Sequence, residues 1–127
     1  MSYKNILLID DDNDDIEIFV EAVNSLHKEI VCQTSSNALK TFEELKTAER
    51  LPDFIFVDFN MPALNGISFI QKMKNQNRLE HIPVILMSTH TADVMCQLTK
   101  QFETINYMTK PNSFQELVVL LDGVLAK

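Results

Sequence analysis

The sequence predicts an α/β domain in which a five-stranded parallel sheet is covered by helices on both faces. Two observations support this prediction. Short runs that are apolar at every position alternate along the chain with longer segments whose apolar residues recur at helical spacing. Strands buried on both faces have the first pattern, and amphipathic helices have the second. Because strand and helix alternate five times, parallel strands joined by crossover helices are the natural architecture.

The apolar runs give the predicted strands. Residues 6–9, 54–57 and 84–87 are the clearest, residues 105–108 are weaker, and residues 30–32 form a short fifth candidate. Each run is too short for a helix of ordinary length, and each is followed by polar residues. We therefore expect five short strands.

The helical segments are recognised by stripes of apolar residues. The stripes are Ile16, Phe19, Val20, Val23 and Leu26; Leu39, Phe42 and Leu45; Ile67, Ile70 and Met73 or Lys74; Val94, Met95, Leu98 and Phe102; and Leu117, Val118, Leu121, Val124 and Leu125. Asn65 precedes Gly66 and is expected to begin the third helix. Ser113 and Glu116 have the spacing of a capping box and predict the start of the last one.

Composition restricts the function. A chain of 127 residues with 46% hydrophobic residues fits one globular domain, which we expect to span residues 1–127 without an effector domain. The net charge of -7 argues against direct binding to nucleic acid or anionic membranes. No apolar stretch approaches the roughly 20 residues that span a bilayer. Cys32 and Cys96 belong to no metal or redox motif and predict buried, reduced thiols, as in a cytoplasmic protein.

Acidic residues follow two of the predicted strands. Asp10 and Asp11 end the first strand and Asp58 ends the third, while Ser88 ends the fourth and Lys110 follows the fifth. In an open parallel sheet, ligands bind beyond the carboxyl ends of the strands. Three carboxylates this close cannot all stay ionised unless a cation lies among them or one is protonated. Oxygen ligands with room for water and phosphate suit Mg²⁺.

Three further aspartates follow this cluster. Asp12 or Asn13 is a suitable N-cap for the first helix. Asp14 and Asp15 would lie in its first turn, where carboxylates interact favourably with the helix dipole. We therefore interpret Asp14 and Asp15 as helix-start residues outside the site, and leave both interpretations open for Asp12.

The segments ILLIDDD, FVDFNMP, PVILMST and YMTKP occur in this order, each at a predicted strand end. Together they resemble the response-regulator receiver domain over essentially the whole chain. The resemblance implies a doubly wound, flavodoxin-like fold with five helices and strand order 2-1-3-4-5. It also implies a signalling switch that catalyses only its own phosphorylation and dephosphorylation. The segment RLEHIPVILMST further resembles stand-alone receivers paired with bacterial phytochrome-type kinases.

The resemblance also assigns roles to residues. Asp58 would accept a phosphoryl group from a sensor histidine kinase or a histidine phosphotransfer protein. Mg²⁺ would be held by Asp11 directly, by Asp10 through a water, by Asp58, and by the backbone carbonyl of Asn60. Lys110 would pair with a phosphoryl oxygen.

Other implied roles concern the switch and its rate. Ser88 would donate a hydrogen bond to the phosphoryl group, and its movement would allow Tyr107 to turn inward. The bond between Lys110 and Pro111 would be cis. Asn60, Thr89 and His90 would tune the reaction rates, with the Thr89 side chain crowding phosphate entry.

The output is expected from binding to an unidentified protein target. The resemblance places the signalling face on the fourth helix, fifth strand and fifth helix. Val119 lies outside the core stripe of the last helix and predicts a partner contact or a phosphorylation-dependent homodimer. A phosphorelay intermediate that passes its group to a histidine would have the same sequence features.

Two other functions compete with this interpretation. Asp10 and Asp12 after a strand also resemble the haloacid-dehalogenase phosphohydrolases, in which the first aspartate is the nucleophile. Those enzymes need an acidic pair after the lysine, and the chain offers only Glu116 and Asp122 there, inside a helix.

A calcium EF-hand is the second competitor. Its loop positions 1, 3, 5 and 12 would be Asp10, Asp12, Asp14 and Glu21. Position six, however, is Asp15 instead of the required glycine.

Overall fold

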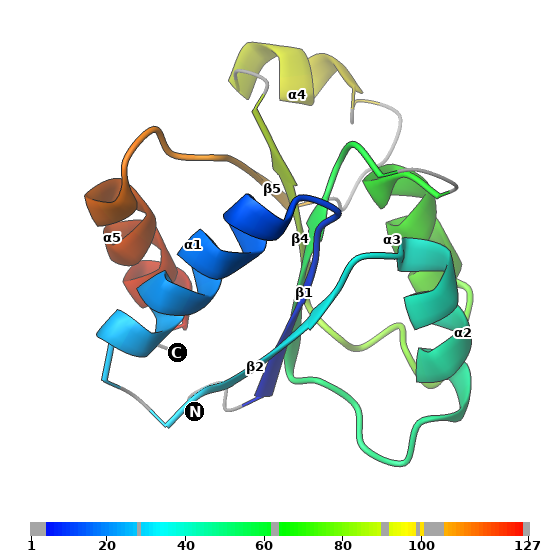
Figure 1. Cartoon of the computed structure of the whole chain (residues 1–127). Helices are drawn as coiled ribbons and strands as arrows, with labels where there is room; N and C mark the ends of the chain where they lie inside the picture. Colours follow the sequence, from blue (N-terminus) through cyan, green and yellow to red (C-terminus); the bar gives the residue numbers. More distant parts are fainter. Residues whose placement is uncertain are drawn as a thin grey trace.

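The computed structural model describes residues 5–27, 29–61, 64–89, 92–98, 100 and 106–125. Five parallel strands form one sheet in the order β2-β1-β3-β4-β5 (Figure 1). The strands are β1 (Asn5–Ile9), β2 (Val31–Ser35), β3 (Phe54–Asp58), β4 (Val84–Ser88) and β5 (Asn106–Thr109). The helices are α1 (Asn13–Ser25), α2 (Ala38–Thr47), α3 (Gly66–Lys74), α4 (Ala92–Leu98) and α5 (Phe114–Leu125). The predicted fold class and strand order are confirmed.

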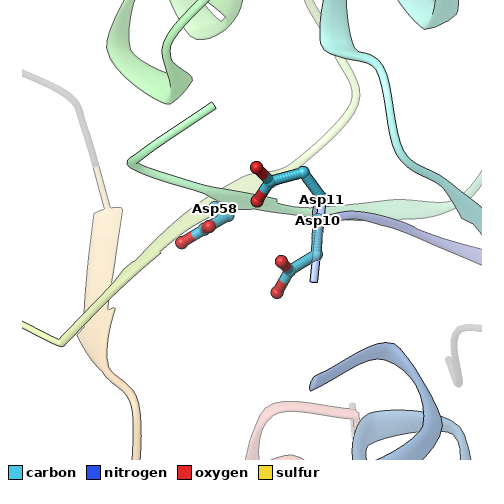
Figure 2. Close-up of side chains that lie close together, drawn as sticks. All are labelled: Asp10, Asp11 and Asp58. Atoms are coloured by element: carbon cyan, nitrogen blue, oxygen red, sulfur yellow. The ribbon is translucent and has the colours of Figure 1, made fainter. Parts of the chain in front are cut away.

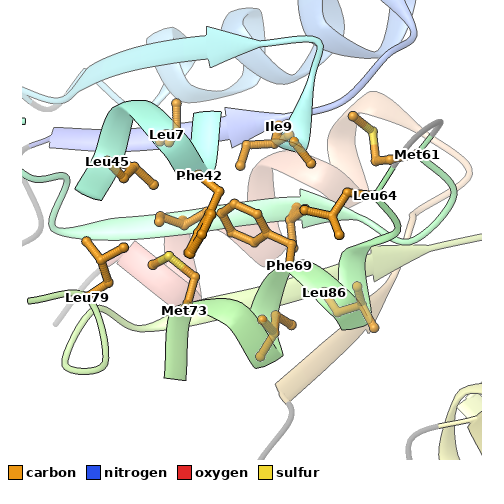
Figure 3. Packing of buried hydrophobic residues seen from close by; sticks show 14 of the residues in the cluster. Leu7, Ile9, Phe42, Leu45, Met61, Leu64, Phe69, Met73, Leu79 and Leu86 are labelled. Atoms are coloured by element: carbon orange, nitrogen blue, oxygen red, sulfur yellow. The ribbon is translucent and has the colours of Figure 1, made fainter. Parts of the chain in front are cut away.

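The helices cover the two faces of the sheet in pairs. Helices α2 and α3 pack on one face against Leu7, Ile9 and their neighbours (Figure 3), and Met95 of α4 belongs to the same cluster. Helices α1 and α5 pack on the other face against Ile6 and Leu8. Successive residues of β1 therefore contribute to opposite cores. This is why the central strands are apolar at every position.

An edge-to-face aromatic contact stabilises each of the two cores. Phe19 of α1 meets Phe56 of β3 edge to face, with ring centroids 5.0 Å apart. Phe42 of α2 and Phe69 of α3 make a similar contact at 6.4 Å. Aromatic pairs in this geometry contribute about 0.5–1.5 kcal/mol beyond their burial. The first contact positions α1 against β3, which ends in Asp58, and the second joins α2 to α3.

Side-chain caps define where the helices begin. Asp12 accepts hydrogen bonds from the backbone of Asp14 and Asp15, and Asn65 accepts one from Ser68, as the sequence predicts for α3. The backbone N–H of Glu116 donates to Ser113 Oγ at 3.1 Å. The N-cap of α1 therefore fixes the chain directly after β1 and within the acidic segment.

Some expectations at the sheet edges are wrong in detail. β2 extends to Ser35, beyond the apolar run, because it is an edge strand whose outer residues tolerate polar side chains. β5 ends at Thr109, and Ile105 and Phe102 lie outside the described residues. Val94 and Cys96 are exposed instead of buried. None of the helices in the described part of the chain is long and apolar enough to span a membrane.

Candidate functional site

Three aspartates meet at the carboxyl ends of β1 and β3. One oxygen from each of Asp10, Asp11 and Asp58 lies within 4.8 Å of the other two (Figure 2). Asp10 and Asp58 are buried, whereas Asp11 is exposed. The structure thus brings together the three carboxylates that the sequence predicts to converge.

The position of this cluster follows from the strand order. β1 pairs with β2 on one side and β3 on the other, so the chain crosses from one side of β1 to the other between them. Asp10 extends the β1 ladder by donating its backbone N–H to Ser35 at 2.9 Å. The backbone N–H of Phe59 donates to Met87 at 2.8 Å and fixes the chain directly after Asp58. Ligand sites in such sheets lie at this kind of reversal.

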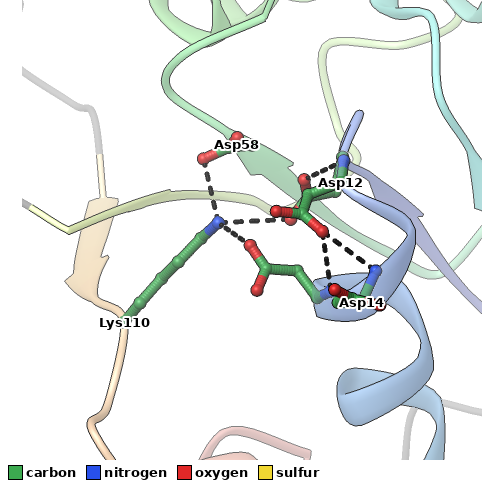
Figure 4. Close-up of polar contacts among 6 residues, drawn as sticks. Asp12, Asp14, Asp58 and Lys110 are labelled. Atoms are coloured by element: carbon green, nitrogen blue, oxygen red, sulfur yellow. Dashed lines mark hydrogen bonds and ion pairs between the residues drawn. The ribbon is translucent and has the colours of Figure 1, made fainter.

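Lys110 supplies the positive charge of the site. Its Nζ lies 3.2 Å from Asp10 Oδ2, 3.0 Å from Asp15 Oδ2 and 3.3 Å from Asp58 Oδ1 (Figure 4). Its backbone N–H donates to the carbonyl of Ser88 at 2.7 Å, which anchors the residue beside β4. Three carboxylates therefore contact this ammonium group, and Asp11 lies beside two of them, Asp10 and Asp58.

Burial changes the acidity of these groups. Loss of hydration raises the pKa of Asp58 to about 6, although Lys110 opposes the shift and Asp10 adds to it. Burial also raises the pKa of Asp10, against the hydrogen bond from the Asp12 backbone and the charge of Lys110. For Lys110, burial lowers the pKa, but the surrounding carboxylates, with Asp15 first among them, raise it above the ordinary lysine value.

Asp15 is a site residue that the sequence analysis assigned to the helix start alone. It lies in the first turn of α1, but its side chain reaches Lys110. The spacing of Asp15 from Phe19 was one indication that its side chain lies on the inner side of α1. Residues four apart share one face of a helix, and Phe19 faces the core. Asp12, left open from the sequence, is the N-cap. Helix α1 occupies residues that an EF-hand would need as a loop, which excludes that alternative.

The remaining predicted residues lie around the cluster. Ser88 is buried at the end of β4, directly after Met87, which pairs with Asp58. Tyr107 is half-buried on β5 opposite Leu86. The exposed Asn60 and Asp11 line one open depression of about 420 Å³. Thr89 is exposed, and His90 lies outside the described residues.

The expected cis peptide bond is wrong. No cis bond occurs in the part of the chain that the structure describes, so the bond between Lys110 and Pro111 is trans. The trans form is the more stable isomer of such a bond by about 0.5–1 kcal/mol. With this bond trans, the Lys110 ammonium reaches both Asp10 and Asp58.

The donor set fits a hard divalent cation. Every candidate ligand is an oxygen, and two of the three carboxylates are withdrawn from water. Burial, and then the charges of Asp10 and Asp11, raise the pKa of Asp58 more than the one ammonium group of Lys110 lowers it. A cation such as Mg²⁺ would oppose this shift, and the exposed position of Asp11 leaves space for its water ligands.

Comparison with known proteins identifies the family. The model of the response regulator receiver domain matches residues 6–122. Chemotaxis protein CheY1 of Helicobacter pylori is 27% identical over 120 residues, which cover 94% of this chain and 95% of that protein. Sensor histidine kinase CheAY of the same organism is 27% identical over 116 residues, 91% of this chain but only 14% of the kinase.

Solved structures share the fold. The phosphorylated cyanobacterial phytochrome response regulator RcpA superposes with a TM-score of 0.82 at 23% identity, covering 97% of this chain and 91% of that one. CheY4 of Vibrio cholerae gives a TM-score of 0.78 at 20% identity, with 98% and 100% covered. The chain belongs to the response-regulator receiver family, and it is a receiver domain of two-component signalling.

Proposed function

We propose that the domain accepts a phosphoryl group on Asp58 from a sensor histidine kinase or a histidine phosphotransfer protein, with Mg²⁺ as cofactor. The observation that supports this most directly is the position of the Asp58 carboxylate. It ends a central strand, between the acidic pair Asp10 and Asp11 and the ammonium of Lys110. A carboxylate is a modest nucleophile, so these neighbours must neutralise and position the group it attacks.

Each residue of the site would have its own role in phosphoryl transfer. A carboxylate oxygen of Asp58 forms the bond to phosphorus while the bond from phosphorus to the donor nitrogen breaks and its electron pair stays with the imidazole. Lys110 pairs with one phosphoryl oxygen, and the Ser88 hydroxyl donates to another. Bound Mg²⁺ would supply charge neutralisation at the phosphoryl oxygens. Asp10, Asp11, Asp58 and the Asn60 carbonyl would hold it.

The same contacts would drive the switch. Ser88 is buried beside the site, and Tyr107 is half-buried on the neighbouring strand. Attraction of the Ser88 hydroxyl to the phosphoryl group vacates space that the Tyr107 ring can fill. A difference of a few kcal/mol between two states is enough to shift their populations. Asn60 lies beside Asp11, and Thr89 and His90 follow Ser88 in the sequence. These three residues would set the rates of phosphorylation and dephosphorylation.

The output surface would then be the face formed by α4, β5 and α5. Val119 on α5 is 71% exposed, although it is a large apolar residue. We assign it to a contact with a protein target or with a second copy of the chain. Sedimentation of the protein with and without a phosphoryl analogue distinguishes these, because only the second raises the mass of the protein alone.

Phosphorylation with radiolabelled phosphoramidate and Mg²⁺ tests the proposed function. We expect the wild-type protein to gain alkali-labile label, as an acyl phosphate requires. Asp58→Asn should gain none, whereas Asp14→Asn, which removes the same charge from an exposed position, should label normally. Label that persists in Asp58→Asn would contradict the assignment and favour Asp10 as the nucleophile.

A further inference from the structure

Lys110 contacts three carboxylates, and the proposed chemistry does not use one of them, Asp15. Its Nζ lies 3.0 Å from Asp15 Oδ2, closer than to Asp10 or Asp58. Asp15 lies in the first turn of α1, whereas Lys110 follows β5, so this ion pair joins segments far apart in the sequence (Figure 4). An ammonium group has three N–H donors, and three carboxylates already match them in number.

A phosphoryl group that approaches Lys110 therefore competes with these carboxylates for its N–H donors. The Asp10 side chain is 2% exposed and would be left without its cation away from water, which is costly. Asp58 gives up its own contact on phosphorylation, because its carboxylate becomes part of the acyl phosphate, so Asp10 and Asp15 are the competitors that remain. The Asp15 side chain is 42% exposed, so water can solvate it once the ammonium has moved. Asp15 is the partner that yields at the lowest cost.

We propose that Asp15 is a positioning residue that holds Lys110 against α1 in the unphosphorylated protein and competes with the phosphoryl group for it. This inference rests on the proposed function, since it concerns the regulation of the same site. Asp15 and Lys110 both line a pocket of about 420 Å³ beside α1 and the start of α5. Phosphorylation would therefore also change the arrangement of the charged side chains that line this pocket.

Asp15→Asn in the full chain tests the competition. With Lys110 released from this charge, the affinity for beryllofluoride in the presence of Mg²⁺ should rise about threefold, as should the rate of phosphorylation by phosphoramidate. This factor corresponds to the usual strength of a partly exposed ion pair. Amide chemical shifts report analogue binding, and intact-protein mass reports phosphorylation.

Two variants make the test specific. Asp15→Glu keeps the carboxylate and should remain close to the wild-type protein. Asp14→Asn removes one charge from the same turn, at an exposed residue outside the contacts of Lys110 described above, and should also leave both values unchanged. A thermal unfolding curve for each variant establishes that it is folded under the assay conditions.

The possible results separate the two proposals. If Asp15→Asn behaves like Asp14→Asn, or binds the analogue more weakly than the wild-type protein, the competition is refuted while phosphorylation of Asp58 stands. If the wild-type protein takes no phosphoryl group on Asp58, both proposals fail. A threefold gain in Asp15→Asn that is absent from Asp15→Glu and Asp14→Asn supports the inference.

Discussion

Asp58 Oδ1 lies 3.3 Å from Lys110 Nζ, although β4 lies between the strand that ends in Asp58 and the strand that precedes Lys110. The Asp58 side chain is 11% exposed and the Lys110 side chain 19% exposed. The two charges are therefore largely removed from water. Burial nevertheless outweighs the contact with Lys110 and raises the pKa of Asp58 to about 6. The site keeps a carboxylate that would be more stable with a further cation.

Removing the Asp58 charge should stabilise the metal-free protein. The pKa of this acid is raised from 3.8 to about 6 on folding, mainly by burial. Between these values the native state holds a proton that the unfolded chain releases, so this group lowers the free energy of unfolding as pH rises. We expect Asp58→Asn to increase that free energy by about 1–3 kcal/mol at pH 7.5, measured by urea unfolding with a chelator present.

The pH profile supplies the control for this prediction. At a pH of about 3.5 the carboxyl group is largely protonated in both states, so the wild-type protein and Asp58→Asn should differ little. The difference should grow across the window from 3.8 to about 6 and then level off. A difference that does not depend on pH would mean that the substitution acts through packing.

Mg²⁺ should stabilise the protein through Asp11 in particular. Asp11 is the exposed member of the three-carboxylate cluster, so its replacement disturbs little else. We expect Mg²⁺ to raise the Tm of the wild-type protein, because a ligand bound only to the native state shifts unfolding. Asp11→Asn should weaken Mg²⁺ binding about tenfold or more by calorimetry. Asp14→Asn has the same net charge and should bind as the wild-type protein does; equal losses in both variants would place the ion elsewhere.

The sheet and the acidic cluster were predictable because they depend on simple rules. Runs such as residues 54–57 are short and apolar at every position, which is typical of a strand covered on both faces. Parallel strands bring their carboxyl ends to one edge, so Asp10 and Asp58 had to approach if β1 and β3 were neighbours. The strand order itself came from the family resemblance.

The contact between Asp15 and Lys110 could not be read from local pattern alone. An acidic residue in the first turn of a helix is already accounted for by the helix dipole. Only the packing of α1 against the sheet turns this side chain toward Lys110. The trans bond before Pro111 was missed for a different reason: the resemblance implied the rarer isomer, and the base rate for proline favoured the observed one.

Removal of Lys110 should destabilise the protein more than removal of an ordinary surface lysine. Lys110→Ala leaves Asp10 and Asp58 without their cation in a largely buried site. We expect the free energy of unfolding to fall by about 2–3 kcal/mol at pH 7.5 without metal, and Mg²⁺ to restore part of it. Lys46→Ala is the control: it removes a partly exposed pair with Glu43 and a contact of the ammonium over the Phe42 ring at 5.4 Å, which together should change stability by about 1 kcal/mol or less. Equal effects of the two substitutions would show that the Lys110 cluster contributes no more than a surface pair.

The two glycines should respond in opposite directions to substitution by alanine. A Cβ at Gly66 would lie 2.7 Å from the backbone oxygen of Asp58 and would also overlap the Leu86 side chain, so α3 and the end of β3 must move apart. We expect Gly66→Ala to lower the free energy of unfolding by about 1–3 kcal/mol and to slow phosphorylation of Asp58. A Cβ at Gly123 meets nothing within 4 Å, so Gly123→Ala should stabilise α5 by about 0.5–1 kcal/mol. Urea unfolding of both variants measures this contrast, and a stabilised Gly66→Ala would contradict the close packing of α3 against β3.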